Sequence, residues 1–160
     1  MQGTEPIVDQ DYVNSKSQEF VDTCSWFLMR KVVRSLTNFI NDSFKETGIL
    51  STQLGTLAIL AIHDKLSVSE IAKELIMDQT TATRNIKNLQ KMNLLQLEEG
   101  EDKRVKMVTL TEEGKSKLMQ VLPIWDFNQK MINQEVGKDN IASLEVILRE
   151  ILSLLQNGPK

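Results

Sequence analysis

The chain has 160 residues, of which 41% are hydrophobic and 26% are charged, and its formal net charge at pH 7 is −3. A chain of this length can bury a sizeable core without disulfides or bound metal. A mildly acidic protein is unsuited to coat nucleic acid nonspecifically, so any contact with DNA must come from a local patch.

The chain contains a single cysteine, Cys24, and a single histidine, His63. One chain can therefore form no intramolecular disulfide and cannot assemble a His/Cys zinc site. The sequence also shows no glycine-rich phosphate loop and no recognisable Ser/His/Asp or Cys/His arrangement for catalysis. We expect no catalytic residue, no metal site and no cofactor, and we predict that the protein is not an enzyme.

Residues 1–17 are polar and acidic, with neither the charged start nor the apolar stretch of a signal peptide. No segment approaches 18 consecutive apolar residues, as a membrane-spanning helix would require. We expect a cytoplasmic protein without a membrane partner. Residues 1–14 show no clear periodicity and are predicted to form a tail that a partner could order.

Residues 15–48 are predicted to contain one long helix. Apolar residues recur at helical spacing between Glu19 and Phe44, and several of them widen the apolar stripe beyond one face. Such a helix is expected to contact two surfaces. Gly48 marks its end, since glycine readily adopts the left-handed conformation that terminates helices.

Residues 49–112 have the pattern of a helix-turn-helix followed by a β-hairpin. The expected caps of its three helices are Ser51 or Thr52, Ser67 in a capping box with Glu70, and Asp78. Strands are predicted over residues 94–98 and 104–110, joined by residues 99–103, which have turn composition. The hairpin would form the wing of a winged helix.

The helix after Asp78 has one apolar side, formed by Ala82, Ile86 and Leu89. Its other side is rich in hydroxyl and basic groups, which can bond phosphates and base edges in a major groove. The candidate DNA-binding residues of this recognition helix are Thr80, Thr81, Thr83, Arg84, Lys87 and Lys91. The alternative is an ordinary solvated helix surface.

Residues 113–160 are predicted to form two further helices. Thr111 caps the first, which runs toward Met131 and is expected to kink at Pro123. Gly137 interrupts the pattern, and a strongly apolar last helix then extends to Gly158. An apolar stripe near the terminus needs another surface to cover it. The fold class is therefore mainly α with a small β-hairpin wing, flanked by amino- and carboxy-terminal helices.

The segment from Leu66 to Gly114 resembles the MarR family of winged helix-turn-helix regulators. The resemblance lies in Thr80-Thr-Ala-Thr-Arg-Asn85, in Glu101-Asp-Lys-Arg104 and in Val108-Thr-Leu-Thr-Glu-Glu-Gly114, and it extends more loosely over residues 17–130. It implies that Arg104 of the wing enters the minor groove of double-stranded DNA and that Asp102 orients it, with Lys103 beside them. The wing residues could otherwise form a simple exposed ion pair. Asn93 stands where the family usually has glycine, and asparagine also tolerates a left-handed cap.

The resemblance further implies a homodimer on a pseudo-palindromic operator, in which the terminal helices form the dimerisation domain. It also implies a pocket for a small-molecule effector between those helices and the winged helix. The candidate lining residues are Trp26, Met29, Arg30, Phe39 and His63. Ordinary core packing is the alternative for these side chains.

Cys24 lies in Thr23-Cys-Ser-Trp-Phe27, which resembles a cysteine-bearing subgroup of the family that senses oxidants. Sensing needs a reachable thiolate stabilised by a positive or polar neighbour, and Arg30 and Lys31 are nearly two turns away. A buried cysteine acting as a small hydrophobe is the alternative. The main prediction is a DNA-binding repressor released by a small ligand or by oxidation of Cys24. A winged helix that binds proteins instead of DNA is the competing function.

Overall fold

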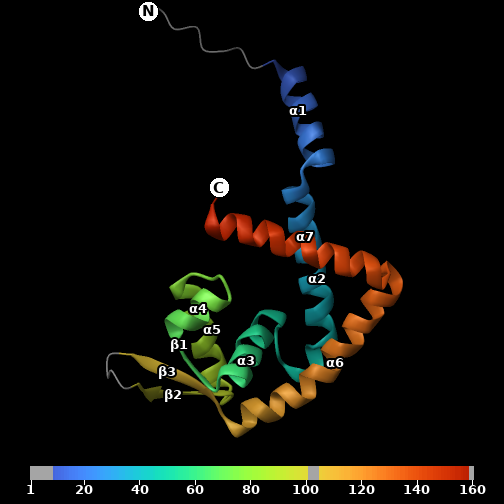
Figure 1. Ribbon diagram of the computed structural model, residues 1–160. Coiled ribbons are helices and arrows are strands. Elements are labelled where there is room, and N and C mark those ends of the chain that lie inside the picture. Colours follow the sequence, from blue (N-terminus) through green and yellow to red (C-terminus); the bar gives the residue numbers. More distant parts are fainter. Residues whose placement is uncertain (1–8, 101–104, 159–160) are drawn as a thin grey trace, which may run out of the picture. The chain divides into compact units, whose positions relative to one another are not determined.

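The computed structural model describes residues 9–100 and 105–158, and Figure 1 shows its helices and its small sheet. The chain divides into two units. Unit 1 extends to Phe39, and unit 2 begins at Ile40. No helix among the described residues is long and apolar enough to cross a membrane.

Unit 1 holds helix α1, Gln10–Thr23, and most of helix α2, Ser25–Ser43, which continues into unit 2. The prediction of one helix starting near residue 15 was wrong in two respects. The helix begins earlier because the Asp9 carboxylate accepts a hydrogen bond from the backbone N–H of Asp11, at 3.1 Å. It is also broken at Cys24, whose backbone is extended with ψ of 103°. Helical spacing of apolar residues continues across this break, so periodicity did not reveal it.

Unit 2 contains the winged helix-turn-helix and the carboxy-terminal helices. Its elements are the 3-10 turn η1 (Lys45–Thr47), α3 (Ser51–His63), β1 (Lys65–Ser67), α4 (Val68–Glu74), α5 (Gln79–Lys91), β2 (Leu95–Glu99), β3 (Lys106–Leu110), α6 (Glu112–Val136) and α7 (Lys138–Asn157). The antiparallel sheet has the order β1-β3-β2. The sequence did not predict β1, because this strand has only three residues and its partner β3 is distant along the chain.

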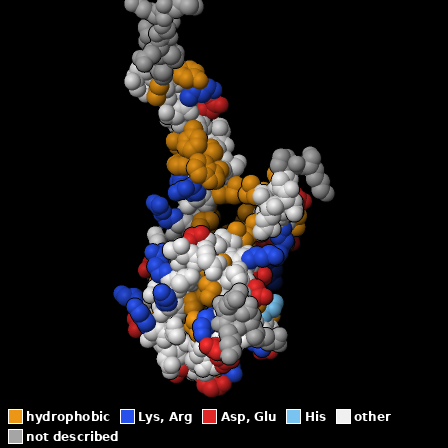
Figure 2. Space-filling view, turned by 90° about the vertical axis from the view of Figure 1, so that its left-hand side faces the viewer, with side chains coloured by type: hydrophobic (Ala, Val, Ile, Leu, Met, Phe, Trp, Pro, Cys, Tyr) orange, Lys and Arg blue, Asp and Glu red, His pale blue; other side chains and the backbone are white. Residues whose placement is uncertain are grey.

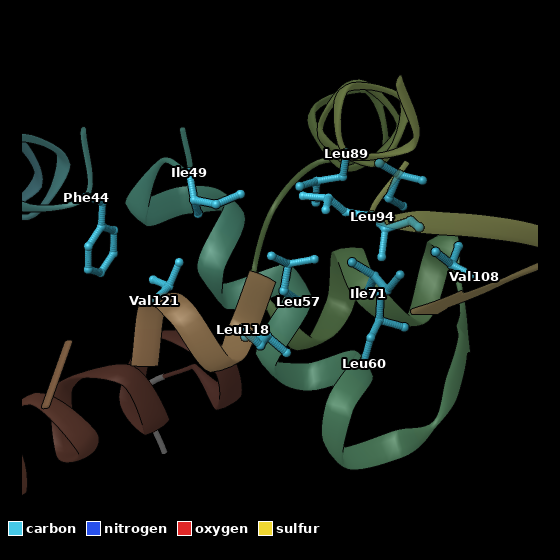
Figure 3. Close-up of a cluster of buried hydrophobic side chains, with 12 residues drawn as sticks. Phe44, Ile49, Leu57, Leu60, Ile71, Leu89, Leu94, Val108, Leu118 and Val121 are labelled. Atoms are coloured by element: carbon cyan, nitrogen blue, oxygen red, sulfur yellow. The ribbon is translucent and has the colours of Figure 1, made fainter. Parts of the chain in front are cut away.

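One cluster of buried side chains joins most of these elements (Figure 3). Phe44 and Leu57 are completely buried, and Leu118 and Val121 attach α6 to the same cluster. The remaining members are Ile49, Leu60, Ile71, Ile86, Leu89, Leu94, Leu95 and Val108. Because α3, α5, the sheet and α6 share this core, the helix-turn-helix has a fixed internal geometry.

Local hydrogen bonds start the helices near the predicted residues. Ser67 and Glu70 form the predicted capping box, and the hydrogen bonds from Ser67 lower the pKa of the Glu70 carboxyl below its ordinary value. At α3 the prediction was wrong by one residue, since Leu50 occupies the cap position. The Gln53 side chain accepts from the Leu50 N–H at 2.8 Å, and Asn41 Oδ1 accepts from the free Ser51 N–H at 2.7 Å, so no capping hydroxyl is needed.

Both helices of the helix-turn-helix end in the same backbone motif, with a residue in the left-handed region. Asn93 has φ of 58° after α5, as predicted, and Ile76 has φ of 51° after α4. In each case the following residue donates its N–H to a carbonyl five positions earlier, as in a Schellman motif. Left-handed φ is strained for a β-branched residue such as Ile76.

We expect Ile76→Gly to raise the free energy of unfolding by about 1 kcal/mol, because glycine adopts the left-handed conformation without a Cβ clash. The Ile76 side chain is 58% exposed, so its removal costs little burial. Urea unfolding followed by circular dichroism measures the change. Ala61→Gly on exposed helical backbone is the control and should lower stability by about 1 kcal/mol. A loss of stability in Ile76→Gly would contradict the prediction.

The carboxy-terminal helices follow the predicted boundaries closely. α6 continues through Pro123 to Val136, and Gly137, with φ of 94°, ends it and precedes α7. No residue of α7 is buried in the single chain. The apolar side chains of α1 and α2 are likewise open to solvent, as the orange side chains of the upper helix in Figure 2 show. These helices offer surfaces that one chain does not cover.

Candidate nucleic-acid interface

Helix α5 presents a polar, basic face opposite its buried stripe. Ala82, Ile86 and Leu89 are buried as predicted. The opposite face forms a shallow surface hollow of ≈ 450 Å³, which is lined by Gln79, Thr80, Thr83, Arg84, Lys87, Asn88 and Lys91. This hollow contains every candidate recognition-helix residue except Thr81.

Thr81 belongs to the cap of α5. Its backbone N–H donates to Asp78 Oδ1 at 2.8 Å, and its hydroxyl donates to Asp78 Oδ2 at 2.7 Å. These hydrogen bonds lower the pKa of the Asp78 carboxyl below its ordinary value. Asp78 therefore stays ionised at the positive end of the helix. The Thr81 hydroxyl already has an acceptor within the protein, which the sequence prediction did not anticipate.

The cations of the α5 face are available for an external partner. Arg84, Lys87 and Lys91 are exposed, and within residues 9–100 and 105–158 none of them forms an ion pair with a carboxylate. The Thr83 hydroxyl, by contrast, donates to the Gln79 carbonyl at 2.7 Å. Positive charge without an internal counterion is what binding to phosphate requires.

Strands β2 and β3 form the predicted hairpin. They pair from Leu95 with Leu110 to Glu99 with Lys106, and Lys106 Nζ lies 3.3 Å from Glu99 Oε1. The Gly100 N–H donates to the Val105 carbonyl at 3.0 Å and extends the ladder toward the tip. The wing candidates Asp102, Lys103 and Arg104 lie outside the described residues, so their roles stay predictions.

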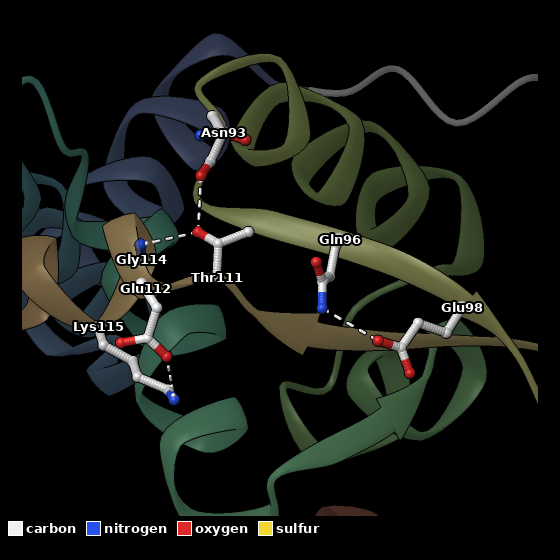
Figure 4. Close-up of polar contacts among 7 residues, drawn as sticks. All are labelled: Asn93, Gln96, Glu98, Thr111, Glu112, Gly114 and Lys115. Carbon is white, nitrogen blue, oxygen red and sulfur yellow. Dashed lines mark hydrogen bonds and ion pairs between the residues drawn. The ribbon is translucent and has the colours of Figure 1, made fainter.

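A compact junction connects the end of α5 to the start of α6 (Figure 4). The Thr111 hydroxyl donates to the Asn93 carbonyl at 2.7 Å and accepts from the Gly114 N–H at 2.9 Å. The Thr111 N–H donates to the Leu94 carbonyl at 3.1 Å. A Cβ on Gly114 would stand 2.1 Å from the Leu94 carbonyl oxygen, so only glycine fits there. The left-handed turn after α5 is thus directly attached to the N-cap of α6.

The predicted effector-pocket residues are dispersed. Met29 and Arg30 line an open hollow of ≈ 640 Å³ on α2. Trp26 and Phe39 are exposed on the same helix, and the Arg30 guanidinium stands 5.4 Å from the centre of the Trp26 ring. His63 is exposed at the end of α3. The pocket formed by these five residues stays a prediction.

An apolar groove that the sequence did not predict lies between α3 and α6. It has a volume of ≈ 470 Å³ and is lined by Ile40, Ser51, Leu54, Gly55, Ala58, Leu122 and Trp125. The small residues Gly55 and Ala58 leave the space, and Leu122 and Trp125 supply the opposite wall. The spacing of Leu122 and Trp125 was the only sequence signal, because their partners are more than 60 positions away.

Cys24 is a free, half-buried thiol at the break between α1 and α2. It lines a small hollow of ≈ 110 Å³ that also includes Thr23, Ser25 and Lys31. The sequence offered no nearby positive group for this thiol, because Lys31 is seven residues away. The structure brings Lys31 to the same hollow, with Nζ 5.7 Å from the centre of the Phe27 ring.

Comparison with known proteins identifies the class of this fold and face. The MarR family model matches residues 47–105. The uncharacterised HTH-type transcriptional regulator YwoH of Bacillus subtilis is 31% identical over 102 residues, which are 64% of this chain and 70% of YwoH. The HTH-type transcriptional regulator SarZ of Staphylococcus epidermidis is 29% identical over 121 residues, which are 72% of this chain and 78% of SarZ.

The crystal structure of the M. tuberculosis transcriptional regulator MosR in complex with DNA is also similar. Its TM-score is 0.67 at 26% sequence identity, and the match covers 80% of this chain and 98% of MosR. These findings define a winged helix-turn-helix transcription regulator. The chain belongs to the MarR family. The family assignment confirms the sequence prediction of a DNA-binding regulator and not an enzyme.

Proposed function

We propose that the protein represses transcription as a homodimer that binds a pseudo-palindromic operator in double-stranded DNA. The observation that carries this proposal is the face of α5, where Arg84, Lys87 and Lys91 have no carboxylate partner among the described residues. In this proposal α5 lies in the major groove. Arg104 enters the adjacent minor groove, with Asp102 orienting it and Lys103 near phosphate. The similar regulator MosR was crystallised in complex with DNA, which supports DNA as the partner.

A winged helix that binds only proteins is disfavoured by the same face. A protein-binding surface is expected to be depleted of charge and to carry apolar or aromatic anchors at its centre. The outer face of α5 instead carries hydroxyl, amide and cationic groups. Electrostatic attraction to phosphate is therefore the better-supported use of this helix.

Binding to DNA tests the proposal directly. Purified protein is titrated with DNA from upstream of its own gene and with scrambled DNA at several salt concentrations. We expect Arg84→Ala and Arg104→Ala each to weaken specific binding by about 1–3 kcal/mol for each protomer of the dimer, since each removes one groove contact per protomer. Lys45→Ala, which removes an exposed cation outside α5 and the wing, should leave affinity unchanged. Absence of binding to either DNA at low salt would overturn the proposal.

The evidence for the proposed homodimer is the apolar surface that a single chain leaves exposed to solvent. The exposed apolar residues of α7 include Leu144, Ile147, Leu148, Leu152 and Leu155, and α2 exposes Leu28, Val32 and Leu36. Monomeric proteins rarely leave large apolar patches in water. Two copies related by a two-fold axis would cover it and would present two recognition helices to two half-sites.

We expect the double substitution Leu148→Glu and Leu152→Glu to convert a dimer into a monomer, because it places four charges in the proposed dimer interface. Light scattering coupled to size-exclusion chromatography gives the mass. Glu145→Gln and Glu150→Gln on the same helix are the matched control and should leave the dimer intact. A monomeric unaltered protein, or an unchanged mass in the Leu variant, would contradict this prediction.

Release from DNA is proposed to follow binding of a small effector. The apolar groove between α3 and α6 is a suitable place for it, since its walls belong to the unit that carries the recognition helix. The pocket predicted from the sequence, with Trp26, Met29, Arg30, Phe39 and His63, is the alternative place for the effector. Effector binding would act by changing the separation of the two recognition helices in the dimer.

Oxidation of Cys24 is a second proposed route of release. The half-buried thiol lines the same small hollow as Lys31. Peroxide treatment of the wild type and of Cys24→Ser, followed by DNA titration, tests this route. Equal sensitivity of both proteins to peroxide would exclude Cys24 as the sensor.

A further inference from the structure

Asn85 is a polar residue on a side of α5 where an apolar residue would be expected. It is half-buried and adjoins the stripe of Ala82, Ile86 and Leu89. The hollow on the outer face of α5 does not include it. Asn85 therefore lies outside the hollow that carries the candidate DNA-binding residues of this helix.

The Asn85 side chain bridges α5 and α3. Its amide Nδ2 donates to Thr56 Oγ1 at 2.9 Å and to the Thr52 carbonyl at 3.3 Å. Thr52 and Thr56 are one turn apart on α3, and Thr56 is completely buried. The two protons of one amide thus have two acceptors on the neighbouring helix.

These hydrogen bonds constrain the rotation of α5 about its own axis, because a hydrogen bond is directional and an apolar contact is not. Burial of Ala82, Ile86 and Leu89 determines which side of α5 faces the core, but apolar contacts have no preferred direction and define the rotation of the helix less finely than hydrogen bonds do. A hydrogen bond weakens steeply when its geometry is distorted. α3 is itself anchored in the core through Leu57, so the two hydrogen bonds define how α5 is turned relative to that core.

We propose that Asn85 is a positioning residue, whose hydrogen bonds to Thr56 and Thr52 set the rotation of α5 that brings Arg84 and Lys87 into register with DNA. The inference rests on the proposed DNA-binding role of α5. Loss of the bridge leaves every cation in place. Specific binding, which needs exact register with base edges, therefore falls, and nonspecific attraction to phosphate persists.

Two isosteric substitutions test the bridge from opposite ends. Binding is measured to two DNA probes. The first is the tightest-binding duplex that the unaltered protein selects from a random pool, and the second is a scrambled duplex. Thr56→Val removes the shorter of the two hydrogen bonds and Asn85→Leu removes both, and we expect each to weaken binding to the selected duplex about three- to tenfold. Binding to scrambled DNA and the salt dependence should not change. The double variant should lose no more than the stronger single variant, because both remove the same bridge.

Thr52→Val is the matched control, since Thr52 contributes only its backbone carbonyl and the substitution should leave affinity unchanged. Weaker binding in Asn85→Leu but not in Thr56→Val would overturn the inference and indicate direct contact of Asn85 with DNA. Equal losses on selected and scrambled DNA would also overturn it, since they would indicate a general structural defect. If the unaltered protein binds neither DNA at low salt, the proposed function itself is overturned, and this inference falls with it.

Discussion

Gly114→Ala is expected to lower the free energy of unfolding by about 4 kcal/mol or more. A Cβ at this position would lie 2.1 Å from the Leu94 carbonyl oxygen and 3.1 Å from its carbon. These are backbone atoms at the junction of α5, β2 and α6, and they cannot move like the end of a side chain. The Thr111 N–H donates to the same Leu94 carbonyl, so a shift would also weaken the N-cap of α6. Urea unfolding monitored by circular dichroism measures the loss.

Gly55→Ala provides the matched control for this substitution. Gly55 also lies in a helix, but a Cβ there meets only the end of the Leu75 side chain, at the ordinary distance of 3.5 Å. We expect stability to be unchanged or to rise by up to about 1 kcal/mol, since alanine is the better helix former. Comparable losses in the two variants would show that the Leu94 carbonyl is not the cause.

Combined replacement of Arg84, Lys87 and Lys91 by alanine is expected to weaken specific DNA binding about a thousandfold. The expected loss combines about 1–3 kcal/mol for one arginine contact with the counterion release associated with two lysines. The slope of log affinity against log salt concentration should fall by about four, because the proposed dimer loses two lysines from each protomer. Fluorescence anisotropy at several salt concentrations measures both quantities. The variant should fold, because all three side chains are exposed and have no ion-pair partner among the described residues.

A charge-matched variant distinguishes the effect of lost local contacts on DNA affinity from the effect of a changed net charge. Replacement of Lys45, Lys130 and Lys138 by alanine changes the net charge by the same amount but removes cations from η1, α6 and α7. Its affinity should stay close to that of the wild type. Similar losses in the two triple variants would mean that only the overall charge matters, and they would contradict the assignment of α5 as the DNA-binding helix.

The recognition helix shows why local sequence predicted so much of the site. The alternation of Ala82, Ile86 and Leu89 with Arg84 and Lys87 depends only on the helical period, and burial follows that period. The caps at Asp78 and Ser67 were equally local, because each carboxylate or hydroxyl bonds a backbone N–H three residues away. Such features need no knowledge of distant residues.

Thr81 and Asn85 show the limit of the same reasoning. Both belong to the motif that suggested DNA contact, and a helical wheel cannot tell which hydroxyl or amide already has a partner. The Thr81 hydroxyl bonds Asp78, and the Asn85 amide bonds Thr56 on a different helix.

The sequence by itself determined the winged helix-turn-helix, the polar face of α5 and the family, because helical period, capping and turn composition are local properties. Only the tertiary structure decided the break at Cys24, the short strand β1, the groove between α3 and α6 and the bridge from Asn85 to Thr56. All but the first join segments that are far apart along the chain. The tertiary structure also decided that Gly114 must be glycine, since its constraint is a carbonyl 20 residues earlier. Packing between distant segments is set by the complementarity of two surfaces, and neither segment encodes it alone.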